Sequence, residues 1–134
     1  MTDVWLDANV MLRYLLRDNE EMFRQACSLV EQAEAGDICL RLASLAVAEM
    51  VWVLESFYGL ERRMITQVLT DVIMADGVVA EEKELMLKSL QDYQVTGVDF
   101  IDAYLAAKAQ ALGHSVATFD KKHFKRLQAK LYPE

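Results

Sequence analysis

Two acidic residues stand at points where a strand is expected to run directly into a helix. Asp7 follows the apolar residues 4–6 and immediately precedes a helical pattern. Asp120 has the same setting between residues 115–119 and a short basic helix. Open α/β sheets carry their sites at the carboxyl ends of their strands, so both acids are candidates for chemistry. Taken singly, each is also an ordinary helix-start carboxylate interacting with the helix dipole.

Three further acids accompany them. Glu49 is the only charge in residues 45–54, and a helix that is apolar on nearly every side should be buried. A buried carboxylate must reach water, pair with a cation or bind a metal. Asp102 lies in the first turn of a helix that Asp99 is expected to cap, and the two share a face. For an isolated Glu49, the structural explanations are the simpler ones.

Together, these acids indicate a metal site. If the strands are parallel neighbours, Asp7, Asp102 and Asp120 converge on one edge, and Glu49 enters from the helix after the second strand. Carboxylates about 5 Å apart repel by roughly 3 kcal/mol at an effective dielectric of 20, so the cluster requires cations. Oxygen ligands favour Mg²⁺ or Mn²⁺, which polarise a phosphoryl group and lower the pKa of an attacking water. The chemistry that fits is phosphodiester hydrolysis.

The elements that must position these acids follow from periodicity and from breaks in it. Strands are expected at residues 4–6, 38–40 and 115–118, with residues 78–79 as a short strand or a turn. Each of the five glycines stands where a predicted helix ends. Asp18 with Glu21 predicts a capping box for the second helix, and Ser44 is a candidate cap for the third, which extends to Tyr58. Strands alternating with helices predict an α/β class with a parallel sheet.

Composition and charge limit the function further. The chain has 134 residues, of which 54% are hydrophobic, which predicts one globular domain and excludes disordered classes. No apolar run approaches the roughly 20 residues of a membrane span, so a cytoplasmic protein is expected. The net charge of −7 argues against binding nucleic acid by bulk electrostatics. Residues 121–130 nevertheless carry five basic side chains and no acid, a pattern equally typical of a solvated helix face.

Four segments, in order, closely resemble the PIN-domain ribonucleases, in particular the VapC toxins of bacterial type II toxin-antitoxin modules. They are residues 5–18 (WLDANVMLRYLLRD), 46–54 (AVAEMVWVL), 99–107 (DFIDAYLAA) and 117–124 (ATFDKKHF). The resemblance covers nearly the whole chain. It implies a single PIN-like nuclease domain over residues 1–134, with a three-layer fold in which helices flank a short parallel sheet of four to five strands.

The resemblance also implies roles for particular residues. Asp7, Glu49, Asp102 and Asp120 match the family's catalytic acidic quartet around Mg²⁺ or Mn²⁺, and Asp99 matches a frequent additional acid that we include among the metal ligands. The implied activity is that of a metal-dependent endoribonuclease toxin with RNA as substrate, a homodimeric state and a cognate antitoxin. The strand expected near residues 130–132 is short and is followed by Pro133.

Other interpretations remain open. A haloacid-dehalogenase-type phosphatase needs Asp-x-Asp after its first strand, whereas this chain has Asp7-Ala8-Asn9. A receiver domain needs a Lys after its last strand, where Asp120 stands. A PIN nuclease of RNA maturation, or an inactive PIN-like binding scaffold, would share the fold. His123 is expected to be an ordinary residue of the basic helix, because no Ser or Cys nucleophile accompanies it. Arg13 is a candidate contact for RNA phosphates.

Overall fold

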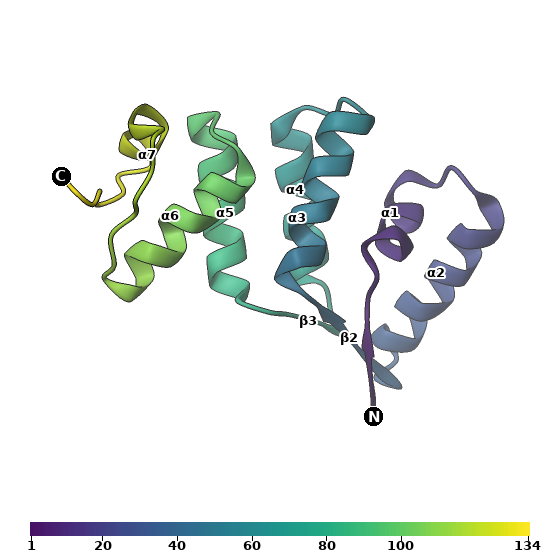
Figure 1. Cartoon of the computed structure of the whole chain (residues 1–134). Helices are drawn as coiled ribbons and strands as arrows, with labels where there is room; N and C mark the ends of the chain where they lie inside the picture. The colour runs from purple at the N-terminus through teal and green to yellow at the C-terminus, as the bar shows by residue number, and fades with distance from the viewer. The chain divides into compact units, whose positions relative to one another are not determined.

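The computed structural model describes residues 1–134, which form two compact units, Met1–Lys83 and Glu84–Glu134. The first unit contains, in order, β1 (Thr2–Trp5), α1 (Ala8–Leu16), α2 (Glu20–Glu34), β2 (Ile38–Leu42), α3 (Ser44–Trp52), the π-helix η1 (Val53–Phe57), α4 (Arg62–Met74) and β3 (Val78–Ala80) (Figure 1). Helix α5 (Lys83–Thr96) begins at the boundary, and the second unit continues with α6 (Phe100–Leu112) and α7 (Lys121–Arg126).

The first unit is built on a parallel sheet with strand order β1-β2-β3, so the predicted α/β class is confirmed. The register pairs Val4 with Leu40 and Leu40 with Val78. Parallel neighbours require crossovers, which are supplied by α1 with α2 and by α3 with α4. Strand β2 lies in the centre and is almost wholly buried, as its apolar sequence ICLRL requires. All three strands therefore end at the same edge.

The sheet has three strands, and the expectation of four to five was too high. Residues 115–118 form no regular strand. Only Val116 is buried there, and it makes an isolated parallel bridge to Leu131 in the second unit. The ladder ends at once because the Thr118 hydroxyl oxygen accepts a hydrogen bond from the Asp120 N–H at 2.9 Å, which turns the chain. The C-terminal segment expected to pair weakly thus contributes this one bridge.

Two predicted helix caps were wrong. Asn19 caps α2 by accepting a hydrogen bond from the Met22 N–H at 3.0 Å, while Asp18, the predicted cap, binds Arg13 instead. Ala43 occupies the cap position of α3 and offers no side-chain hydrogen bond, so Ser44 is the first helical residue. Two neighbouring residues can both fit the sequence pattern of a cap, as Asp18 and Asn19 do. Which of them caps the helix then depends on its contacts in the folded protein.

The helix predicted over residues 44–58 is α3 followed without interruption by η1, and it stops before Gly59. Gly77 adopts φ +81°, and a Cβ there would lie 2.6 Å from the carbonyl oxygen of Ala33. Only glycine therefore fits at the start of β3. No helix of the protein is both long and apolar enough to cross a membrane.

Candidate functional site

Three of the polar side chains around α6 and α7 form a cluster in the second unit. One ligand atom each from Asp102, Asp120 and His123 lies within 4.8 Å of the others. His123 Nδ1 and a carboxylate oxygen of Asp120 are 2.5 Å apart. Asp102 and His123 are half-buried and Asp120 is exposed, so the cluster is open to solvent on one side. Two carboxylates and an imidazole in this arrangement are able to hold a divalent cation.

Local hydrogen bonds fix Asp120 within this cluster. Its side chain caps α7 by accepting a hydrogen bond from the His123 N–H at 3.2 Å. Its own N–H donates to the Thr118 hydroxyl, as described above. A helix was expected to begin after Asp120, and α7 does so, although the strand expected before it is only the bridge at Val116. His123 was expected to have no role. Its spacing of three residues from Asp120, on the first turn of the same helix, is the pattern that would have indicated it.

The electrostatics of the cluster are those of a site lacking positive charge. Burial raises the pKa of Asp102, and the neighbouring carboxylates of Asp99 and Asp120 raise it further, while His123 acts in the opposite direction. Asp99 occupies the cap position of α6, as predicted, although its side chain makes no capping hydrogen bond. Since Asp99 and Asp102 stand three residues apart in one helical turn, the charge of Asp99 disfavours ionisation of Asp102.

Asp7 and Glu49 belong to the first unit. Asp7 is exposed at the carboxyl end of β1 and caps α1 by accepting a hydrogen bond from the Asn9 N–H at 3.2 Å. Glu49 is exposed on α3 and so reaches water, which was one of its three expected settings, but the expectation that the helix itself is buried on nearly every side was wrong. Leu45 and Trp52 of the same helix are also exposed, at 84% and 62%, which shows that α3 keeps one apolar side open. Two of the predicted acids, Asp7 and Glu49, therefore belong to the first unit, and Asp102 and Asp120 belong to the second.

Glu81 and Glu82 are acids at the sheet edge that the sequence analysis did not select. They directly follow β3, and Glu81 accepts a hydrogen bond from the Ser44 N–H at 3.1 Å. Glu82 accepts one from the Ser44 hydroxyl at 2.7 Å. These two carboxylates therefore replace the missing cap of α3 and favour its positive N-terminal end. Residues 78–79 were as compatible with a turn as with a strand. The position of Glu81 and Glu82 at the sheet edge could therefore not be predicted from the sequence.

Arg13 is held within the first unit and is not a free contact for phosphate, contrary to expectation. Its Nη1 donates to both carboxylate oxygens of Asp18 at 2.7 Å. Tyr58 accepts a hydrogen bond from Arg13 Nη2 at 3.4 Å and donates one to Asp18 at 3.1 Å. Tyr58 and Asp18 both raise the pKa of Arg13. This network joins the end of α1 to the end of η1, and so fixes the two helices that follow Asp7 and carry Glu49.

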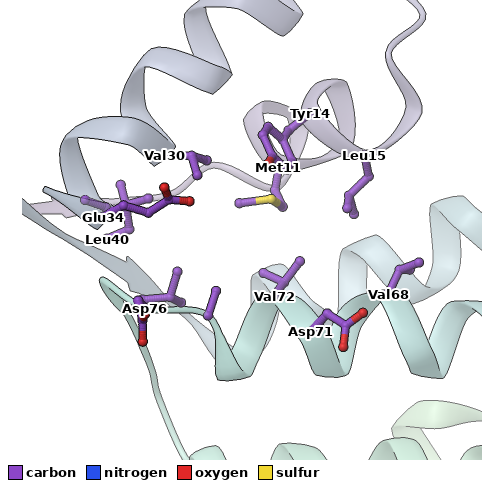
Figure 2. Close-up of a pocket in the computed structure, with 13 residues that line it drawn as sticks. Met11, Tyr14, Leu15, Val30, Glu34, Leu40, Val68, Asp71, Val72 and Asp76 are labelled. Atoms are coloured by element: carbon purple, nitrogen blue, oxygen red, sulfur yellow. The ribbon is translucent and has the colours of Figure 1, made fainter.

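One cavity of the first unit lies away from these acids. It has a volume of about 250 Å³ and is walled by α1 and α2 on one side and by α4 on the other (Figure 2). Met11, Leu15 and Val30 face Val68 and Val72 across it, and none of Asp7, Glu49, Ser44, Glu81 or Glu82 lines it. The cavity is therefore separate from the candidate acids of the first unit.

Comparison with known proteins decides the family. The sequence profile of the PIN domain matches residues 4–130. The chain belongs to the PIN domain family. No curated protein matches the chain closely enough to be reported as a relative. PIN domains have a nuclease-type fold, are generally metal-dependent nucleases, and act on RNA.

The residues of this PIN domain fit a divalent metal. Asp102, Asp120 and His123 supply oxygen and nitrogen ligand atoms within 4.8 Å of one another. Burial raises the pKa of Asp102 most, and the neighbouring carboxylates of Asp99 and Asp120 add repulsion that a bound cation would relieve. The oxygen-rich donor set suits Mg²⁺ and Mn²⁺, and the imidazole makes Mn²⁺ the more favourable of the two.

Proposed function

We propose that this PIN domain is an endoribonuclease that hydrolyses RNA phosphodiester bonds with Mg²⁺ or Mn²⁺, and that it is the toxin of a type II toxin-antitoxin module. The observation that carries the activity is the Asp102–Asp120–His123 cluster, in which three possible ligand atoms lie within 4.8 Å of one another. The toxin role rests on the resemblance of four sequence segments to the VapC toxins. We further propose that residues 1–134 act as one nuclease domain.

Asp7, Glu49, Asp102 and Asp120 are the proposed catalytic acids, and these four with Asp99 are the proposed metal ligands. When bound, the metal polarises the phosphoryl group and makes an attacking water more acidic. Asp120 and His123 orient one another through the contact between the carboxylate and Nδ1 of the imidazole. Ser44, Glu81 and Glu82 hold the start of the helix that carries Glu49. These contacts keep the acids in place before substrate arrives, which reduces the reorganisation that catalysis requires.

Two partners follow from the same proposal. A homodimer would cover the apolar side of α3 that exposes Leu45 and Trp52. An antitoxin would inhibit by placing an Arg among the uncompensated carboxylates, because a guanidinium binds carboxylate bidentately and supplies the missing positive charge. The free thiols of Cys27 and Cys39 suit the reducing cytoplasm, where such a module acts.

Cleavage of an RNA that is single-stranded over part of its length tests the activity. We expect cutting in Mg²⁺ or Mn²⁺ and none in excess EDTA. Asp7→Asn, Glu49→Gln and Asp102→Asn should each lower the rate by roughly 100-fold or more, because each removes a charged ligand. Asp99→Asn should be milder, and Asp71→Asn, an acid on α4, serves as the matched control.

Undiminished cutting in EDTA would contradict the proposal. Loss of rate in Asp71→Asn equal to that in Asp102→Asn would show that general charge, rather than the named ligands, governs the activity. If no RNA is cut but the protein still binds RNA, the inactive binding scaffold becomes the better interpretation.

A further inference from the structure

Phe119 is the most exposed large hydrophobic residue of the protein, with a relative exposure of 108%. Its ring packs against nothing. The backbone on both sides is nevertheless fixed, because Thr118 accepts a hydrogen bond from the Asp120 N–H and Asp120 accepts one from the His123 N–H. The turn that sets Asp120 in the metal cluster therefore also holds an aromatic ring in solvent, one residue away from a proposed ligand.

The charge around this ring is positive. Lys121, Lys122, Lys125 and Arg126 of α7 are all exposed, and none forms an ion pair or a side-chain hydrogen bond. In a protein with a net charge of −7, four uncompensated cations in six residues form a local surface of opposite sign. An exposed aromatic ring between cations is suited to a ligand that carries both flat bases and phosphates.

We propose that Phe119 stacks on an unpaired base of the RNA next to the phosphate that is cut, while the cations of α7 contact the flanking phosphates. The inference rests on the proposed function and adds to it the side chain that would contact a base beside the cut. A base within a duplex is stacked on its neighbours and presents no free face, so paired RNA would not engage the ring. Stacking tolerates any base, so Phe119 would select strandedness more than sequence.

The test measures the affinity of the full chain for a labelled single-stranded RNA oligonucleotide and for the same sequence annealed to its complement. The protein carries Asp7→Asn, so that the RNA is not cut during the measurement. We expect single-stranded RNA to bind more tightly than the duplex. Phe119→Ala should weaken single-strand binding about 5- to 100-fold, Phe119→Leu nearly as much, and Phe119→Trp little, because only the aromatic ring stacks. Phe57→Ala is the matched control, since Phe57 is 78% exposed and belongs to the first unit.

An abasic position moved along the oligonucleotide identifies the stacked base. At one position, the missing base should weaken binding to the Phe119 protein but not to Phe119→Ala, which is the coupling expected when ring and base contact each other. Equal affinities of Phe119→Ala and the parent protein, or full affinity in Phe119→Leu, would overturn the inference. So would a change of oligomeric state in Phe119→Ala without a change in affinity. Cleavage by the protein with Asp7 intact, measured separately, reports on the proposed function alone.

Discussion

Asp102 is proposed to bind metal as a charged carboxylate, but its surroundings disfavour that charge. It is half-buried, faces the charges of Asp99 and Asp120, and has a pKa above its ordinary value near 3.8. The unfolded chain therefore releases the Asp102 proton at a lower pH than the folded protein does. Binding of the Asp102 proton therefore stabilises the folded protein. This stabilisation is present in full at a pH below the ordinary pKa, and it is lost as the pH rises through the raised pKa. At neutral pH without metal, Asp102 destabilises the fold.

Asp102→Asn should accordingly raise the melting temperature in EDTA at pH 7, by roughly 2–4 °C for a modest gain in stability, while abolishing most cleavage. The gain should disappear at a pH below the ordinary carboxyl pKa, where Asp102 is already neutral. Thermal unfolding of both proteins across this pH range measures the effect.

Asp120→Asn is the informative comparison, because Asp120 caps α7 and pairs with His123. That variant should lose stability or gain none, since an amide retains the cap but not the carboxylate that contacts the His123 imidazole. A lower melting temperature for Asp102→Asn in EDTA would show that Asp102 is a structural acid.

At the scale of the elements, the close approach of α2 to the start of β3 limits the sequence most strictly. Gly77→Ala should destabilise the protein by at least about 2 kcal/mol, because the added Cβ meets the Ala33 backbone and φ is positive. Gly36→Ala has nearly the same positive φ, +82° against +81°, with nothing within 4 Å of the added Cβ. Its cost should be limited to the backbone strain of about 1 kcal/mol.

Urea unfolding of the two alanine variants separates steric from conformational cost. Equal losses of unfolding free energy would show that the clash between Gly77 and Ala33 is relieved by movement, and that only the positive φ matters.

The positions of helices and strands were predictable from sequence where they depend on residues close together in the chain. All five glycines have positive φ at or near the helix ends expected of them, and the helices occur where apolar periodicity placed them. Prediction failed where a tertiary partner decides. Asp18 has the sequence pattern of a helix cap, but its side chain binds Arg13 instead. Residues 115–118 have the pattern of a strand, but only Val116 finds a partner, Leu131. Arg13 lies five residues before Asp18 but on the preceding helix, and Leu131 lies 15 residues after Val116, so no pattern within a single element reports either partner.

At the scale of the whole molecule, the sequence selected Asp102 and Asp120, which the structure brings together, but missed His123 and the Ser44 contacts of Glu81 and Glu82. Asp120 was recognised because the end of an apolar run is a strong local pattern. His123 was overlooked because it was interpreted as an ordinary residue of a basic helix, although its spacing of three residues from Asp120 places the two side chains together. The proposed joint action of Asp7 and Glu49 with the acids of the second unit stays a prediction from sequence resemblance.

Binding of Mn²⁺ tests that joint action. The ion should raise the melting temperature of the unaltered protein in proportion to RT ln(1 + [Mn²⁺]/Kd), by about 2.7 kcal/mol of stability at 100 times Kd. Asp7→Asn and Asp102→Asn should each reduce the increase, because we propose ligands in both units. Asp71→Asn should preserve it. A full Mn²⁺ response in Asp7→Asn would remove Asp7 from the ligand set.

The division of the chain into Met1–Lys83 and Glu84–Glu134 has a consequence for synthesis. Each unit is one continuous stretch, so a ribosome adding about 5–20 residues per second completes the first before it reaches Asp102 and Asp120. A nascent chain therefore carries Asp7 and Glu49 for some seconds without the other two proposed acids. If the four proposed acids act together, we expect the order of translation to delay cleavage of RNA, and chains terminated before Asp102 to be inactive.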